Sequence, residues 1–214
     1  MIYTFFNGTP LRLVPCEQDN GYRFFVSKDG KIGLRIAPSG VETMQNATTA
    51  TCENCKVKYN ANRKQRYLKY KHPWNTNKVL YVSRAVYLAW SGKPIPPYHQ
   101  IHHLTGIVTD NNIDNLLCVS IFKEHRIADD RQKALKTVVP NGDLRGFDYA
   151  ILRELQAPRT MSDADFQSRL EYLRFMRDCD FDPRIFTAAD FHYWFSMPFE
   201  EFKAFFLKYK DSPA

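Results

Sequence analysis

Three of the chain's six histidines, His102, His103 and His125, lie in one short stretch, residues 101–130. An imidazole titrates near neutral pH and is the commonest metal ligand in proteins, so these residues can serve as a base or as ligands. Asp129 follows His125 by four residues, and on a helix two side chains with that spacing share a face. Adjacent residues of a strand point to opposite faces, so His102 and His103 can do different work. The stretch could bring His102 and the helical pair to one divalent cation, which would leave His103 to act as a base.

The elements that would hold these side chains can be predicted from the flanking residues. Residues 98–104 predict a short strand, a polar loop follows, and residues 113–120 predict a second strand. A helix is expected to begin near residue 122 and to carry both His125 and Asp129. Apolar residues at helical spacing predict a further helix over about 82–91, ended by Gly92. The predicted order after this helix is strand, loop, strand, helix.

The net charge of +7 is unevenly distributed along the chain. Residues 1–140 carry 20 Lys/Arg and 10 Asp/Glu, whereas residues 141–214 carry 10 and 13. A basic surface attracts a polyanion, so the first 140 residues are expected to contact nucleic acid. No apolar run reaches the length of a membrane span, and the N-terminus lacks the pattern of a signal peptide. The five scattered cysteines argue against a secreted disulfide framework, which predicts a cytoplasmic protein without a membrane partner.

One segment, residues 56–71, concentrates the positive charge. It contains seven Lys/Arg and no acidic residue, interleaved with Tyr59, Tyr67 and Tyr70. Basic residues attract phosphate and tyrosines can stack on bases or sugars, although the tyrosines can equally pack inward from a solvated pair of strands. The predicted nucleic-acid contacts are the seven basic residues of this segment and two arginines elsewhere: Lys56, Lys58, Arg63, Lys64, Arg66, Lys69, Lys71, Arg84 and Arg126.

The two ends of the chain differ in their expected structure. Residues 2–36 predict strands with a hairpin around Lys28-Asp29-Gly30, because an Asp-Gly pair favours a tight turn. Residues 37–51 are rich in small and polar residues and predict a loop. Residues 143–214 predict several short helices, one of them opened by Ser162 with Asp165 three residues later.

The order of the candidate chemical residues resembles a known family. The His102-His103 pair is followed by Asn115, twelve residues after His103, and then by a Glu-His pair that ends at His125. With the preceding Arg-containing helix, residues 78–130 resemble the HNH nuclease motif in its ββα-metal fold. Within that family, they resemble the variety of the motif found in phage and mobile-element homing endonucleases.

The resemblance implies a role for each matching position. His103 matches the general base that activates water, and Asn115 matches the asparagine that holds the loop and orients this base. His102 and His125 match metal ligands, and Asp129 falls where some relatives have a further histidine ligand. Such a base needs an acceptor, for example a backbone or amide carbonyl, on its other ring nitrogen. One divalent cation is implied: Mg²⁺ or Mn²⁺ first, with Zn²⁺ or Ni²⁺ as alternatives, since imidazole suits the transition metals better than magnesium.

Cys52 and Cys55 have the spacing of half a zinc site. Many relatives that hold a structural zinc carry a second cysteine pair just before the last motif histidine, whereas this chain has Cys118 alone there. This departure argues against a structural zinc.

Together these patterns predict an α+β fold in three parts. Residues 1–75 form a β-rich basic region that contacts DNA, residues 76–136 form the ββα-metal HNH core, and residues 143–214 form a helical region. The expected function is metal-dependent hydrolysis of double-stranded DNA, of the nicking or homing type, in the cytoplasm of a bacterial host. The alternative is a non-catalytic nucleic-acid-binding or structural protein that retains the HNH fold.

The helical region is net negative, whereas homing relatives often end in a basic helical DNA-binding module. Residues 143–214 are therefore expected to pack on the nuclease core, to contact a protein partner or to self-associate.

Overall fold

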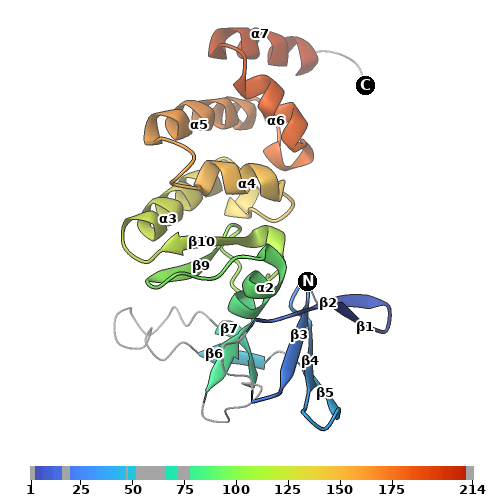
Figure 1. Cartoon of the computed structure of the whole chain (residues 1–214). Coiled ribbons are helices and arrows are strands. Elements are labelled where there is room, and N and C mark those ends of the chain that lie inside the picture. The colour runs from blue at the N-terminus through green and yellow to red at the C-terminus, as the bar shows by residue number, and fades with distance from the viewer. Residues whose placement is uncertain (1–2, 16–19, 47, 52–65, 72–77, 211–214) are drawn as a thin grey trace. The chain divides into compact units, whose positions relative to one another are not determined.

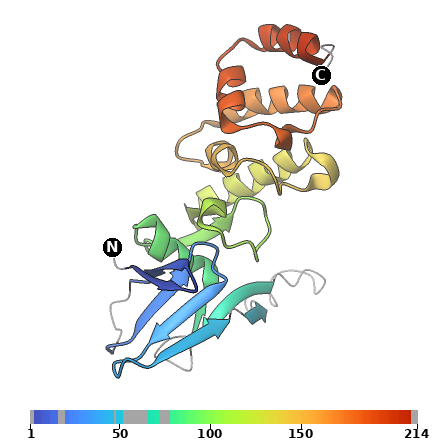
Figure 2. The ribbon, with the colours of Figure 1, turned by 90° about the vertical axis from the view of Figure 1, so that its right-hand side faces the viewer.

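The computed structural model describes residues 3–15, 20–46, 48–51, 66–71 and 78–210. The chain divides into two compact units. The first unit consists of residues 1–103 and 107–119, and the second unit consists of residues 104–106 and 120–214. Strands dominate the first unit and helices the second, which confirms the predicted α+β class (Figures 1 and 2).

An antiparallel sheet of five strands, each paired with the next along the chain, opens the first unit (Figure 2). Its strands are β1 (Tyr3–Phe6), β2 (Thr9–Leu13), β3 (Arg23–Ser27), β4 (Ile32–Ile36) and β5 (Glu42–Asn46). The predicted hairpin is confirmed as β3 and β4, whose turn places Gly30 at a φ of +69°. A positive φ is strained for residues with a side chain, so the glycine suits this turn.

The predicted loop over residues 37–51 is wrong. Most of this segment forms β5 and β6 (Thr48–Thr51). β5 pairs with β4, which places Met44 opposite Leu34, and its Thr43 is β-branched and favours a strand. An edge strand can keep polar side chains in water, so a polar composition did not exclude pairing.

A second sheet in the first unit has the order β6, β7 (Arg66–Lys71), β8 (Val79–Tyr81). Helix α2 (Val82–Ser91) follows directly and confirms the predicted helix, with Gly92 at a φ of +68° after its last turn. The buried face of α2 packs against residues of β3 and β7. This core includes Phe24, Val26, Tyr70, Val82, Ala85, Val86, Ala89 and Leu116.

The predicted strand, loop, strand and helix are all present. Strands β9 (His99–His103) and β10 (Leu116–Ser120) pair with each other, and the 3₁₀ turn η1 (Ile113–Asn115) precedes β10. The helix is α3 (Lys123–Lys136). β9 belongs to the first unit and α3 to the second.

The second unit continues with four further α-helices and two short 3₁₀ turns. These are η2 (Pro140–Gly142), α4 (Tyr149–Gln156), α5 (Asp163–Asp178), η3 (Pro183–Ile185), α6 (Ala188–Phe195) and α7 (Phe199–Lys210). The predicted cap of α5 is confirmed, because the Ser162 hydroxyl accepts a hydrogen bond from the Asp165 amide at 3.0 Å. No helix in the described part of the chain is long and apolar enough to cross a bilayer.

Aromatic packing and buried arginine contacts hold the second unit together. Phe191, Trp194, Phe202 and Phe206 are buried, and their rings lie edge-on or tilted to one another. The Arg131 side chain on α3 is 4% exposed, and its guanidinium donates to the carbonyl of Met161 at 2.9 Å and to the carboxylate of Asp163 at 2.7 Å. Arg131 therefore ties α3 to the start of α5.

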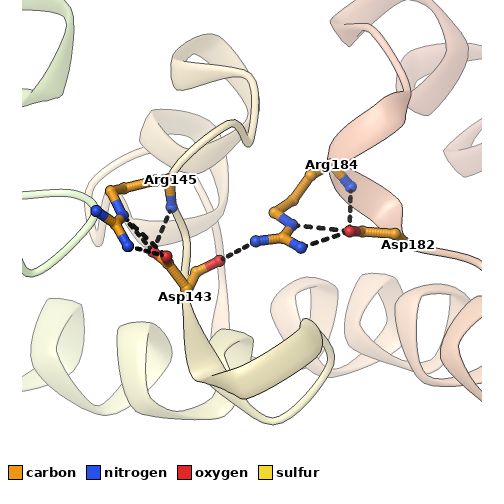
Figure 3. Close-up of polar contacts among 4 residues, drawn as sticks. All are labelled: Asp143, Arg145, Asp182 and Arg184. Carbon is orange, nitrogen blue, oxygen red and sulfur yellow. Dashed lines mark hydrogen bonds and ion pairs between the residues drawn. The ribbon is translucent and has the colours of Figure 1, made fainter.

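Two Asp-Arg pairs lie next to η2 and η3, and the second of them joins the two segments (Figure 3). Arg145 donates to the Asp143 carboxylate, which lowers the pKa of Asp143 to about 2. Arg184 donates to Asp182, which lowers the pKa of that carboxyl group, and also to the backbone carbonyl of Asp143 at 3.1 Å. The second pair thus bridges two segments that are about forty residues apart in sequence.

Candidate functional site

His103 is buried at the end of β9, with 4% of its surface exposed. Its Nε2 lies 3.2 Å from Oδ1 of Asn111, which is also buried. The Asn111 amide nitrogen donates to the Thr109 carbonyl at 3.2 Å, so the amide oxygen is the atom that faces the ring. An amide oxygen accepts a hydrogen bond, so Nε2 carries the proton and the basic lone pair of His103 is on Nδ1.

The His103 ring is neutral near pH 7. Burial lowers the pKa of His103 to about 4, and the nearby His102 adds to this effect. The hydrogen bond that His103 donates to Asn111 and the charge of Asp110 act in the opposite direction but do not offset burial. A neutral imidazole can accept a proton, which general-base chemistry requires.

Asn115 is fully buried in η1. Its amide nitrogen donates to the backbone carbonyl of Asp110 at 2.8 Å, and its backbone N–H donates to the carbonyl of Asn112 at 2.8 Å. Asn115 therefore closes residues 107–115, which we call the Asn loop. The sequence reasoning expected an amide carbonyl beside His103 but did not single out Asn111, whose only signal was its place in a polar loop.

The histidine and the carboxylate expected on one helix face do meet. On α3, Nδ1 of His125 lies 3.3 Å from the carboxylate of Asp129, one turn later, and about a third of each side chain is exposed. His102 is buried on β9. Among the described residues, His102, His125 and Asp129 make up a possible metal-binding group. Two imidazoles and one carboxylate fit a divalent transition-metal ion.

The segment that follows His103 is tied to the helices of the second unit. The backbone carbonyl of Leu104 accepts hydrogen bonds from the side-chain amides of Gln132 on α3, at 3.0 Å, and of Gln156 on α4, at 2.8 Å. Both glutamines are buried. These contacts lie within the second unit, to which Leu104 belongs.

Five of the nine predicted nucleic-acid contacts fall among the described residues. Arg66, Lys69 and Lys71 belong to β7, and Arg84 and Arg126 are exposed on α2 and α3. The other four predicted contacts lie outside the described residues: Lys56, Lys58, Arg63 and Lys64. Cys52, Cys55 and Tyr59 also lie outside the described residues.

The two described tyrosines of the basic segment have different surroundings. Tyr70 is buried and its hydroxyl donates to the carbonyl of Gly30, so it packs inward. Tyr67 is half-buried, and its ring centroid lies 6.3 Å from that of His103 and 6.2 Å from that of Tyr81. On β7, Tyr70 therefore packs in the core, whereas Tyr67 lies next to the candidate base His103.

One comparison with known proteins gives a match. Residues 80–126 match the model of a family described as HNH endonuclease. The match begins in β8 and ends in the first turn of α3, so it includes His102, His103, Asn111, Asn115 and His125. No curated protein and no solved structure matches the chain.

Proposed function

We propose that this chain, whose residues 80–126 match the HNH endonuclease family model, hydrolyses phosphodiester bonds of double-stranded DNA. The family supports nuclease activity and a nucleic-acid substrate. The observation that carries the proposal is the buried, neutral His103 held by Asn111 inside the matched segment.

His103 is the general base of the proposed reaction. A phosphodiester resists hydrolysis until its attacking water loses a proton, and a correctly placed base contributes typically 10²- to 10⁴-fold to such a rate. Asn111 accepts from Nε2–H, so Nδ1 takes the proton from water. Asn115 keeps the Asn loop closed and so keeps Asn111 in place.

His102, His125 and Asp129 are the proposed ligands of one divalent cation. When bound, the ion would neutralise charge on the phosphate and stabilise the leaving oxygen. The donor set supports Mn²⁺, Ni²⁺ or Zn²⁺ binding, and Mg²⁺ is retained as a candidate although it prefers oxygen ligands. The contact between His125 and Asp129 on α3 supports the use of both as ligands of one ion.

The DNA backbone is proposed to contact the basic residues of β7 with Arg84 and Arg126, together with the basic residues of segment 56–65. Their side chains would neutralise phosphates, so binding should weaken steeply with salt. A single metal centre cuts one strand per binding event, which supports nicking, the chemistry also expected of a homing-type enzyme. A protein contact or self-association of the second unit is supported by exposed apolar side chains on η3, α6 and α7: Ile185, Tyr193, Phe205 and Leu207.

Relaxation of supercoiled plasmid tests the proposal. The native protein, His103→Ala and His99→Ala are compared in Mg²⁺, Mn²⁺ and EDTA. His99 is the matched control because it lies on the same strand, and its ring faces the backbone carbonyl of Pro97 at 2.9 Å. We expect metal-dependent nicking by the native protein and by His99→Ala, and its loss in His103→Ala.

Two results would count against this proposal. Equal nicking by His103→Ala would exclude His103 as the base. Salt-sensitive DNA binding without cleavage, in all three metal conditions and on DNA libraries that sample many sites, would favour the non-catalytic nucleic-acid-binding alternative.

A further inference from the structure

The turn between β3 and β4 contacts the Asn loop, although it lies about fifty residues before the matched family segment. The backbone N–H of Ile113 donates to the carbonyl of Lys28 at 3.1 Å. The ammonium group of Lys28 lies 2.7 Å from the carboxylate of Asp114. A backbone hydrogen bond and an ion pair therefore join two consecutive residues of the Asn loop to one residue of the turn.

The turn is itself held rigidly. The Asp29 carboxylate accepts hydrogen bonds from the Ser27 hydroxyl at 2.7 Å and from the Lys31 amide at 3.1 Å. The buried Tyr70 hydroxyl donates to the carbonyl of Gly30 from β7. Hydrogen bonds within the turn and from the buried Tyr70 hold the turn in place. A turn held in this way can fix the position of the Asn loop.

The approach of the turn to the loop is close. A β-carbon at Gly30 would lie 2.4 Å from Cγ1 of Val82 on α2 and 3.3 Å from Cβ of Asn111. Only a glycine leaves room there for both neighbours. Residues 29–31 and 109–112 also line a common pocket with Leu68.

A continuous series of contacts leads from the turn to the candidate base. The backbone amide of Asp114 donates a hydrogen bond to the side-chain oxygen of Asn112, two residues earlier, at 3.1 Å. Asn115 closes the loop onto Asp110, and Asn111 in between holds His103. A displacement of Lys28 or Gly30 would therefore reach the His103 ring through the Asn loop.

We infer that the β3–β4 turn positions the general base, with Lys28 and Gly30 as positioning residues that touch neither substrate nor metal. This inference rests on the proposed function for its effect on catalysis. It gives the N-terminal sheet a role in the reaction that the HNH segment by itself does not supply. Catalytic rates fall steeply when a reacting group shifts by about 1 Å, so a modest contact can have a measurable effect.

A charge swap across the Lys28–Asp114 pair tests this role. The variants are Lys28→Glu, Asp114→Lys and the double variant that carries both. Lys31→Glu is the matched control, since Lys31 lies in the same turn and undergoes the same change of charge, but its ammonium pairs with Asp29 within the turn. Cleavage of plasmid is measured in steady state, with plasmid in excess over protein and at saturating metal, so that kcat and KM are determined separately.

We expect each single variant to lower kcat by about tenfold, because the loop loses its anchor, and the double variant to return to within about threefold of native. Lys31→Glu should keep its kcat and change at most KM. If the double variant stays as slow as the single ones, or if Lys31→Glu loses the same kcat, the positioning role is refuted and Lys28 would be a DNA contact.

Hydrogen exchange of the Ile113 amide provides a readout that needs no activity. Its protection should fall in Lys28→Glu, stay native in Lys31→Glu and return in the double variant. Unchanged protection in Lys28→Glu would overturn the inference whatever the cleavage data show. A native protein that cuts no DNA would refute the proposed function, whereas the exchange experiment would still decide whether the turn holds the loop.

Discussion

Two groups of candidate chemical residues, one in each unit, are held in different ways. In the first unit, His103 is held by Asn111 from a loop that is itself closed by Asn115 and joined to a hairpin turn. In the second unit, His125 and Asp129 meet because they are one turn apart on a single helix. His103 is buried and is held by contacts from a separate loop, whereas His125 and Asp129 are partly exposed and lie on one helix, α3.

This difference suits the chemistry that each of the two groups of residues would perform. A base must hold one ring nitrogen toward water, which calls for a fixed ring in a single tautomer. Metal ligands need only converge on one ion, and partial exposure lets the ion enter. We therefore expect changes around His103 to affect the reaction rate, and changes around His125 to affect metal affinity.

The largest effect should come from the support of the base. Asn111→Ala removes the acceptor of Nε2–H and should lower kcat by about 100-fold without a comparable change in KM. Asn111→Asp keeps an acceptor oxygen beside the ring and should retain more activity than Asn111→Ala. Steady-state kinetics on plasmid measure both variants, and equal activity of Asn111→Ala and the native protein would remove Asn111 from the mechanism.

The second effect concerns the scaffold of α3. Arg131→Met leaves the carbonyl of Met161 without a charged donor and should lower the stability of the second unit by about 2 kcal/mol. Lys133→Met on the same helix is the control, because Lys133 is exposed and pairs with Asp130 at the surface. Amide hydrogen exchange of α4 and α5 reports the change. A loss of kcat in Arg131→Met well below its unfolding temperature would contradict the separation of scaffold from chemistry.

The third effect concerns the metal. Asp129→Asn keeps the size of the side chain but removes its charge, and should weaken Mn²⁺ binding by about tenfold. Cleavage should recover when the metal concentration is raised, in contrast to Asn111→Ala. Asp130→Asn, one residue further and paired with Lys133, is the control. Calorimetric titration of Mn²⁺ into each protein tests this, and native affinity in Asp129→Asn would exclude Asp129 as a ligand.

The smallest effect is expected at the Asp182–Arg184 pair. The hydrogen bonds from Arg184 lower the pKa of Asp182 below its ordinary value of 3.8, so their contribution to stability is fully present above about pH 4. It is lost as the pH falls through the lowered pKa. Arg184→Gln should therefore destabilise the second unit by less than about 1 kcal/mol at pH 7, and by less still near pH 2. Hydrogen exchange of α6 at several pH values measures this difference, and an equal loss at all pH values would assign the effect to packing.

Much of the fold followed from local patterns. The hairpin turn at Asp29-Gly30, the helix before Gly92 and the start of α5 at Ser162 were predicted because their signals are local. The strands within residues 37–51 were missed, because β5 is formed by pairing with β4 rather than by its own composition. A polar edge strand can keep its side chains in water, so its composition carries little signal of a strand.

The sequence by itself determined the identity and order of the candidate chemical groups. It also determined that His125 and Asp129 share a helix face, since a spacing of four residues has this consequence on any α-helix. Tertiary structure decided that Asn111 is the partner of His103, that burial keeps this ring neutral, and that Lys28 contacts the Asn loop. These features depend on contacts between separate segments of the chain, and residue spacing along one element cannot encode them.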